Sequence, residues 1–210
     1  MSMLNKIASG LCALTFISAA GAAQLTPATY AQETARAYRS LDAIRAHLQG
    51  AQPLQQINWP VGDFHKLKIE FIMPGDGRKE VRNEEVYQGK NAFWYVTTIN
   101  LMGQAQKTEA LMDRADGSTL RLIVNGKEES TNDGSTVEII EQAETTITVP
   151  AGTFDCIYVK AKVTPAQGQP QEVELWVNPI DVNLDGALKI AFQTQFGPLA
   201  MVLEEFGPRH

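Results

Sequence analysis

The 210-residue sequence predicts a mainly β protein of the α+β class, with one N-terminal helix followed by an antiparallel sheet of about ten strands. Two observations lead to this fold class. A helical period of apolar residues occurs only at residues 26–50, whereas everything after Trp59 consists of short runs with strand patterns. The turn sequences between these runs are too short to hold crossover helices, so neighbouring strands are expected to be antiparallel.

The first residues have the pattern of a secretory signal peptide, predicted over residues 1–23. Lys6 precedes an apolar run, and the small residues at 20–23 offer a cleavage site. A membrane anchor is the alternative, but the apolar run is interrupted and shorter than the roughly 20 residues that a span needs. A lipid-modified Cys12 is a further alternative, although Leu11 stands where a lipobox places a small residue. Residues 24–210 are therefore expected to form a single domain located in the periplasm or secreted.

Composition and charge narrow the classes of partner. The chain has a formal net charge of -6 and a pI near 5.1, and its 18 Lys and Arg residues form no run. Nucleic acids and anionic membrane surfaces attract clustered basic side chains, so neither is expected as a partner. After the signal peptide no stretch is apolar enough to span a bilayer, so an integral membrane protein is not expected.

The expected elements follow from periodicity and turn chemistry. The helix is predicted at about 28–49, begun by Thr26 and Pro27 or by a capping box of Thr29 and Gln32, and ended by Gly50. The meander is predicted over about 62–207. Its expected strands lie at 64–73, 84–88, 92–101, 106–113, 119–125, 135–141, 145–149, 153–163, 171–177, 187–193 and 199–206. Alternation along them predicts one continuous apolar face and one charged face.

One segment matches part of a metal-binding motif. Residues 181–186, DVNLDG, fit the first half of a calcium loop, in which alternate oxygens converge on the cation. The second half fails because Phe192 occupies the position of the bidentate Glu, and Val182 and Leu184 are apolar where an exposed loop would be polar. A structural turn is therefore favoured over a metal site, and no metal or other cofactor is predicted.

No set of residues in the sequence has the pattern of a catalytic centre. Cys156 is the only cysteine left once the signal peptide is removed, so no internal disulfide can form. It is predicted to be a packed structural thiol, with a redox or dimer-forming role as the alternative. Acid, base and nucleophile do not converge in any motif, so no enzymatic activity is predicted.

Three stretches carry a family resemblance: WPVGDF at residues 59–64, VPAGTFDCIYVK at 149–160, and ELWVNPIDVNLDGALKIAFQTQFGPLAMVLEEFG at 174–207. Together they resemble exported bacterial β-rich proteins of uncharacterised families, which are similar to the LolA, LolB and LppX group of lipoprotein and lipid carriers in Gram-negative bacteria. That group's pattern is a strand ending in Trp-Val, a V-x-L-x-G loop and a hairpin ending in Glu-Phe-Gly. Val182, Leu184 and Gly186 would then be structural residues of the loop.

The resemblance implies a LolA-like domain. Its sheet would be strongly curved, an unclosed β-barrel, with the N-terminal helix packed on the concave apolar face where acyl chains bind. The sequence departs from the group in having only one clear helix.

The function expected from these observations is that of a periplasmic, non-catalytic binding protein for a lipid, acyl chain or other apolar ligand. A helix of about 20 residues is only about 30 Å long and cannot cover so broad an apolar sheet, so a ligand would fill the remainder. The alternative is a structural or interaction protein of the cell envelope, with a filled core, no ligand and an envelope protein as partner. The candidate ligand-binding residues are Leu67, Phe71, Phe93, Tyr95, Leu122, Val159, Leu175, Phe192 and Met201.

Overall fold

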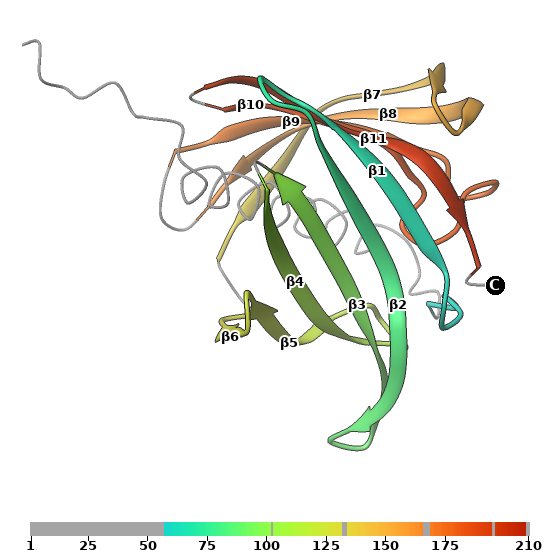
Figure 1. Cartoon of the computed structure of the whole chain (residues 1–210), viewed down its shortest axis with the longest axis vertical. Coiled ribbons are helices and arrows are strands. Elements are labelled where there is room, and N and C mark those ends of the chain that lie inside the picture. Colours follow the sequence, from blue (N-terminus) through green and yellow to red (C-terminus); the bar gives the residue numbers. More distant parts are fainter. Residues whose placement is uncertain (1–56, 102, 132–133, 166–168, 195, 209–210) are drawn as a thin grey trace, which may run out of the picture.

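The computed structural model describes residues 57–101, 103–131, 134–165, 169–194 and 196–208. These residues form one open antiparallel sheet of eleven strands (Figure 1), and no helix occurs among them. The strands are β1 (Phe64–Glu70), β2 (Gly75–Tyr87), β3 (Lys90–Leu101), β4 (Gln104–Asp113), β5 (Thr119–Val124), β6 (Lys127–Glu129), β7 (Thr136–Val149), β8 (Gly152–Thr164), β9 (Gln171–Val177), β10 (Ala187–Thr194) and β11 (Gly197–Gly207).

The predicted α+β class is therefore wrong for the described part of the chain, which is all-β. The helix expected at about 28–49 lies outside the described residues. Within the described ranges, buried apolar side chains of β1, β3 and β8 to β11 belong to one common cluster. No helix in those ranges reaches the length and hydropathy of a membrane span.

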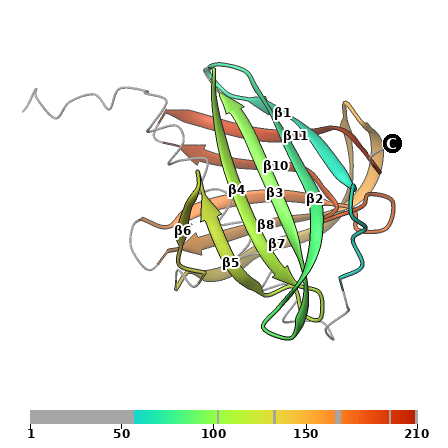
Figure 2. The ribbon, with the colours of Figure 1, turned by 60° about the horizontal axis from the view of Figure 1, so that its bottom comes forward.

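The sheet consists of two meanders joined by the first and last strands. The strand order is β6-β5-β4-β3-β2-β1-β11-β10-β9-β8-β7, so β1 pairs with β11 and the sheet ends at β6 and β7. The sequence predicted a meander but not this pairing. In Figures 1 and 2 the strands β8 to β10 run across the direction of β2 to β4, so the sheet is strongly coiled around its inner face.

Irregularities in the pairing help the sheet to bend. Between β1 and β11, Lys66 pairs with Glu205 and Leu67 with Leu203, which leaves Glu204 as an extra residue. Leu188 is extra in the same way between β9 and β10. Such bulges increase local twist and bend the strand that carries the extra residue.

The described residues form four buried apolar clusters: a small one of Ala92, Trp94, Val96 and Leu111, and three larger core clusters. The first core cluster comprises Ile69, Ile99, Leu101, Val159, Ala161, Val163, Val173, Leu175, Ala187, Ile190, Phe192, Leu199 and Met201. The second core cluster comprises Ile57, Val81, Phe93, Tyr95, Ala110, Met112, Leu122 and Leu184. The third core cluster comprises Leu67, Val149, Cys156, Val182, Leu188, Val202 and Leu203. The loop between β9 and β10 contributes Leu184 to the second cluster and Val182 to the third, so it contacts both halves of the sheet.

Candidate functional site

The loop between β9 and β10, residues 178–186, is held by the side chain of Asn178. Its amide oxygen accepts hydrogen bonds from the backbone N–H groups of Ile180 (2.9 Å) and Asp181 (2.8 Å). Its amide nitrogen donates to the backbone carbonyl of Asp155 (2.9 Å) and to Asp181 Oδ2 (2.8 Å). The loop is therefore a fixed turn rather than a loose connection.

Two apolar side chains of this loop enter the core. Val182 is 2% exposed in the third core cluster, and Leu184 is 6% exposed in the second. Leu184 adopts a positive φ of 53°, an unfavourable conformation for a bulky residue, which the surrounding contacts must enforce. The V-x-L-x-G spacing thus places Val182 in the third core cluster and Leu184 in the second.

Asp185 follows Leu184 and accepts hydrogen bonds from three different strands. Lys79 Nζ on β2 donates to Asp185 Oδ2 at 2.5 Å, and Tyr95 Oη on β3 donates to the same oxygen at 3.0 Å. The backbone N–H of Ala187 donates to Oδ1 at 3.2 Å. His65 Nδ1 on β1 lies 3.5 Å from Oδ1. Since His65 pairs directly with Lys79 across β1 and β2, one inward row of the sheet supplies both groups.

His65 links the same row to the loop a second time. Its side chain is fully buried, and Nε2 lies 2.9 Å from the backbone carbonyl oxygen of Asn183 and 3.1 Å from Asn183 Oδ1. Burial lowers the pKa of His65, an effect that Lys79 reinforces and that the charge of Asp185 opposes. The neutral imidazole therefore donates from Nε2–H to Asn183.

Asp185 stays ionised in this environment. Burial raises the pKa of its carboxyl group, but the charge of Lys79, the charge that His65 carries once it is protonated at acidic pH, and the hydrogen bond from Lys79 outweigh burial, and the pKa ends well below its ordinary value. Lys79 is 1% exposed. The result is a largely buried Lys79–Asp185 ion pair, in which the Asp185 side chain is 17% exposed, and this pair holds the loop against β2 and β3.

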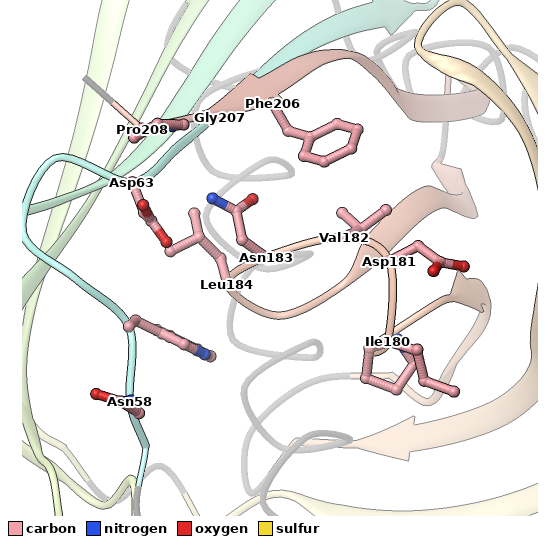
Figure 3. Close-up of a pocket in the computed structure, with 12 residues that line it drawn as sticks. Asn58, Asp63, Ile180, Asp181, Val182, Asn183, Leu184, Phe206, Gly207 and Pro208 are labelled. Carbon is pink, nitrogen blue, oxygen red and sulfur yellow. The ribbon is translucent and has the colours of Figure 1, made fainter. Parts of the chain in front are cut away.

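An open pocket of about 500 Å³ lies beside this loop (Figure 3). Its wall combines the loop with the residues that precede β1 and the end of β11. The lining residues are Asn58, Trp59, Asp63, Pro179, Ile180, Asp181, Val182, Asn183, Leu184, Phe206, Gly207 and Pro208. The volume falls within the usual range for small-molecule sites.

Trp59 is held in this wall by Arg114, which binds its backbone, and by two aromatic rings, which pack against its indole. Arg114 donates from Nη1 to the carbonyl of Ile57 (2.9 Å) and from Nη2 to the carbonyl of Trp59 (3.0 Å). The indole ring packs 5.6 Å from the ring of Phe93 and 5.4 Å from that of Tyr95, measured between centroids. Trp59 also lines the pocket.

Asp63 is the most buried polar residue of the pocket wall, at 8% exposed. Its backbone is held firmly, because its N–H donates to Pro60 O (3.2 Å) and its carbonyl accepts from Val81 N–H (3.0 Å). Its carboxylate makes no hydrogen bond or ion pair with any residue in the described ranges. Figure 3 shows this side chain turned from the start of β1 towards the loop.

The nine residues predicted from the sequence to bind ligand are divided among the three clusters. Leu67 belongs to the third core cluster, and Phe93, Tyr95 and Leu122 belong to the second. The first core cluster holds the other members. These are Val159, Leu175, Phe192 and Met201, with the partly buried Phe71 packed against them. None of the nine lines the pocket itself.

The half-matched calcium motif has a structural use. Asp181 accepts from Asn178, and Asp185 accepts from Lys79 and Tyr95. Among the described residues no group of three or more His, Cys, Asp or Glu side chains is arranged to hold a metal ion. Cys156 is a free thiol, 7% exposed in the third core cluster, and burial raises its pKa. A thiol in that state is a weak nucleophile.

Sequence patterns did not reveal the polar groups of the site. The sequence motifs assign no role to Lys79, His65 or Asp63, although all three are buried in the structure. For Lys79, the available signal was the alternation of Gly77, Lys79 and Val81, since all three face inward on β2.

Comparisons with known proteins give likenesses in structure only. No family model matches the chain, and no curated protein matches it. A protein of Parabacteroides distasonis, described as a candidate lipoprotein, shares 11% identity at a TM-score of 0.41. A protein of Bacteroides fragilis, described as a candidate exported protein with a YmcC-like fold, shares 12% identity at a TM-score of 0.44. Each likeness covers 74% of this chain and 100% of the other. A likeness at this level does not extend to function.

Proposed function

We propose that this chain is a non-catalytic binding protein of the cell envelope whose ligand has an apolar part, such as a lipid or an acyl chain. The pocket beside the loop at 178–186 is the proposed site. The signal pattern at residues 1–23 supports a location outside the cytoplasm, and the resemblance to the LolA-like carriers supports the ligand class.

One observation carries the proposal. The apolar wall of the pocket is formed by the ends of two core clusters: Trp59 and Leu184 on the side of the second, Val182 and Phe206 on the side of the third. An apolar ligand placed there would extend both clusters. Burying about 250 Å² of its surface would gain about 6 kcal/mol, from which the entropic cost of binding is subtracted.

The nine residues predicted from the sequence to bind ligand fall into two groups under this proposal. Leu67, Phe93, Tyr95 and Leu122 support the pocket from within its two clusters. A role in ligand binding for the five residues in or against the first core cluster stays a prediction.

The proposal is tested with N-phenyl-1-naphthylamine, an uncharged probe that fluoresces in apolar sites. Saturable binding in the micromolar range is expected. Ile180 is 90% exposed at the pocket, so Ile180→Ser removes apolar contact without disturbing the core and should weaken binding about fivefold. Val86→Ser is the matched control, because Val86 is 72% exposed on β2 and does not line the pocket. Equal affinities for the two variants would place the probe elsewhere, and no binding at all would remove the proposal.

The alternative function, a structural or interaction protein with a filled core, is favoured by a different observation. Eight of the nine predicted ligand-binding residues are at most 8% exposed, so they are already packed against other groups. On this alternative the pocket stays empty, and the purified protein binds neither the fluorescent probe nor alkyl amphiphiles of any charge.

A further inference from the structure

The charged residues of the pocket wall are all acidic. Of the 12 residues that line it, Asp63 and Asp181 carry carboxylates, Asn58 and Asn183 carry amides, and none is Lys, Arg or His. A wall of this kind repels an anionic head group and favours a cation or a group rich in hydrogen-bond donors.

Asp63 gives the wall a specific contact point. The residue is more than nine-tenths buried, lines the pocket, and its carboxylate has no partner among the described residues. The carboxylate oxygens are not among the buried polar atoms that lack a partner, so they face the open pocket, where an ammonium group of a ligand could pair with them. Two nearby cations donate to other acceptors: Lys79 on β2 to Asp185, and Arg114, which follows β4, to Glu84 and to the carbonyl of Trp59.

A metal ion fits the wall less well than an organic cation. Calcium requires six to eight oxygen ligands, and the carboxylate of Asp181 is engaged by Asn178. No cluster of metal-ligating side chains occurs in the described ranges. Trp59 and Phe206 stand in the same wall as Asp63, and aromatic faces attract ammonium groups.

We infer that the pocket binds an amphiphile with an ammonium or amine head group, which pairs with Asp63 while its alkyl part lies against Trp59 and Leu184. This inference rests on the proposed function, because it names the chemical class of ligand for the same pocket. The inference goes further than the proposed function, because it predicts that ligands with the same alkyl chain bind with affinities set by the charge of the head group.

Three probes with the same alkyl chain separate charge from apolar contact: decylammonium, decanol and decanoate, each titrated calorimetrically into the purified chain. Decylammonium is expected to bind about tenfold more tightly than decanol, and decanoate more weakly than decanol. Asp63→Asn, which keeps the size of the side chain, should weaken decylammonium about tenfold and leave decanol within about twofold. Asp181→Asn should weaken decylammonium by a smaller factor, because its carboxylate is exposed and already hydrogen-bonded.

Glu138→Gln is the matched control for the loss of one negative charge. Glu138 is exposed on β7 and does not line the pocket, so all three affinities should be unchanged. Thermal unfolding of each variant shows whether its fold is intact. If Asp63→Asn fails to fold, weaker binding of decylammonium by Asp181→Asn tests the role of the acidic wall instead.

The outcomes separate the inference from the proposed function. If all three probes bind equally, or if decanoate binds best, the head-group inference is overturned while the apolar pocket stands. If no probe binds, both fail. Calcium binding that is lost in Asp63→Asn, without discrimination among the alkyl probes, would assign the carboxylate to a metal ion and overturn the inference.

Discussion

Lys79 illustrates how strongly a single buried charge can depend on its partner. Its ammonium lies 2.5 Å from Asp185, and the residue is 1% exposed. Removing one member of such a pair leaves the other charge buried without compensation, which typically costs about 3–5 kcal/mol. Removing both costs less, because no charge remains to be desolvated.

Lys79→Met is therefore expected to lower the free energy of unfolding by about 3–5 kcal/mol. The double variant with Asp185→Leu should recover part of that loss. Urea denaturation of the wild type, the single variant and the double variant measures both effects. A loss below about 1 kcal/mol for Lys79→Met would contradict the buried ion pair.

His65 and Asp185 predict the dependence of stability on pH. Burial lowers the pKa of His65 in the folded protein, so its contribution to stability is fully present above the unfolded value of about 6.5 and is lost as the pH falls from there to the folded pKa. The lowered pKa of Asp185 adds a second loss below about pH 4. The urea midpoint should accordingly be lower at pH 5.5 than at pH 7.5, and His65→Gln should reduce the difference. Equal midpoints in the wild type would show that His65 titrates alike in both states.

At the scale of elements, the loop at 178–186 depends on the backbone freedom of Gly186. Its φ is +66°, and a Cβ atom there would lie 2.8 Å from the carbonyl oxygen of Asn178. Gly126, in the turn between β5 and β6, has a similar φ of +81° but no atom within 4 Å of the added Cβ. An alanine at Gly126 therefore measures the free-energy cost of the left-handed backbone alone, and an alanine at Gly186 adds the cost of the clash with Asn178.

Gly186→Ala should destabilise the protein by about 2–4 kcal/mol, and Gly126→Ala by only about 1 kcal/mol. Gly186→Ala should also weaken ligand binding, because the loop forms one wall of the pocket. Thermal unfolding and probe titration check the two effects. Equal losses of stability in the two variants would show that the backbone can move to relieve the contact between Asn178 and a Cβ atom at position 186.

The sequence predicted elements well where the pattern was local. Alternation located the strands around Tyr95, Val159 and Leu175, and the turn chemistry identified residues 181–186 as a structural loop. The sequence did not predict the start of β2, where Gly75 to Gly77 have the composition of a turn but pair with β1, and Asp76 and Gly77 pair with β3 as well.

The candidate site was hidden for a physical reason. Lys79 and Asp185 are 106 residues apart in sequence, and a charge that faces inward cannot be distinguished from a solvated one until its partner is placed. Asp63 is hidden for a different reason: its burial and its place in the pocket wall depend on the loop at 178–186 and the end of β11, which are distant in sequence. Local patterns predicted the strands, and the pairing of distant strands determined which side chains meet.

At the scale of the whole molecule, the pairing of β1 with β11 brings the two ends of the described chain together at one end of the coiled sheet. Trp59 and Asp63 precede β1, whereas Phe206 lies near the end of β11 and Pro208 follows that strand. The loop between β9 and β10 completes the pocket from the other half of the sheet. A ligand bound there would contact three segments that are distant in sequence, and it should raise the stability of the whole sheet by mass action.

A methyl and indole NMR titration with decylammonium tests this account most directly. The account predicts shifts concentrated at Trp59, Val182 and Leu184, with Val159 and Ile190 of the first core cluster unaffected. Shifts confined to the first core cluster, or no shifts at a saturating concentration of the probe, would contradict it.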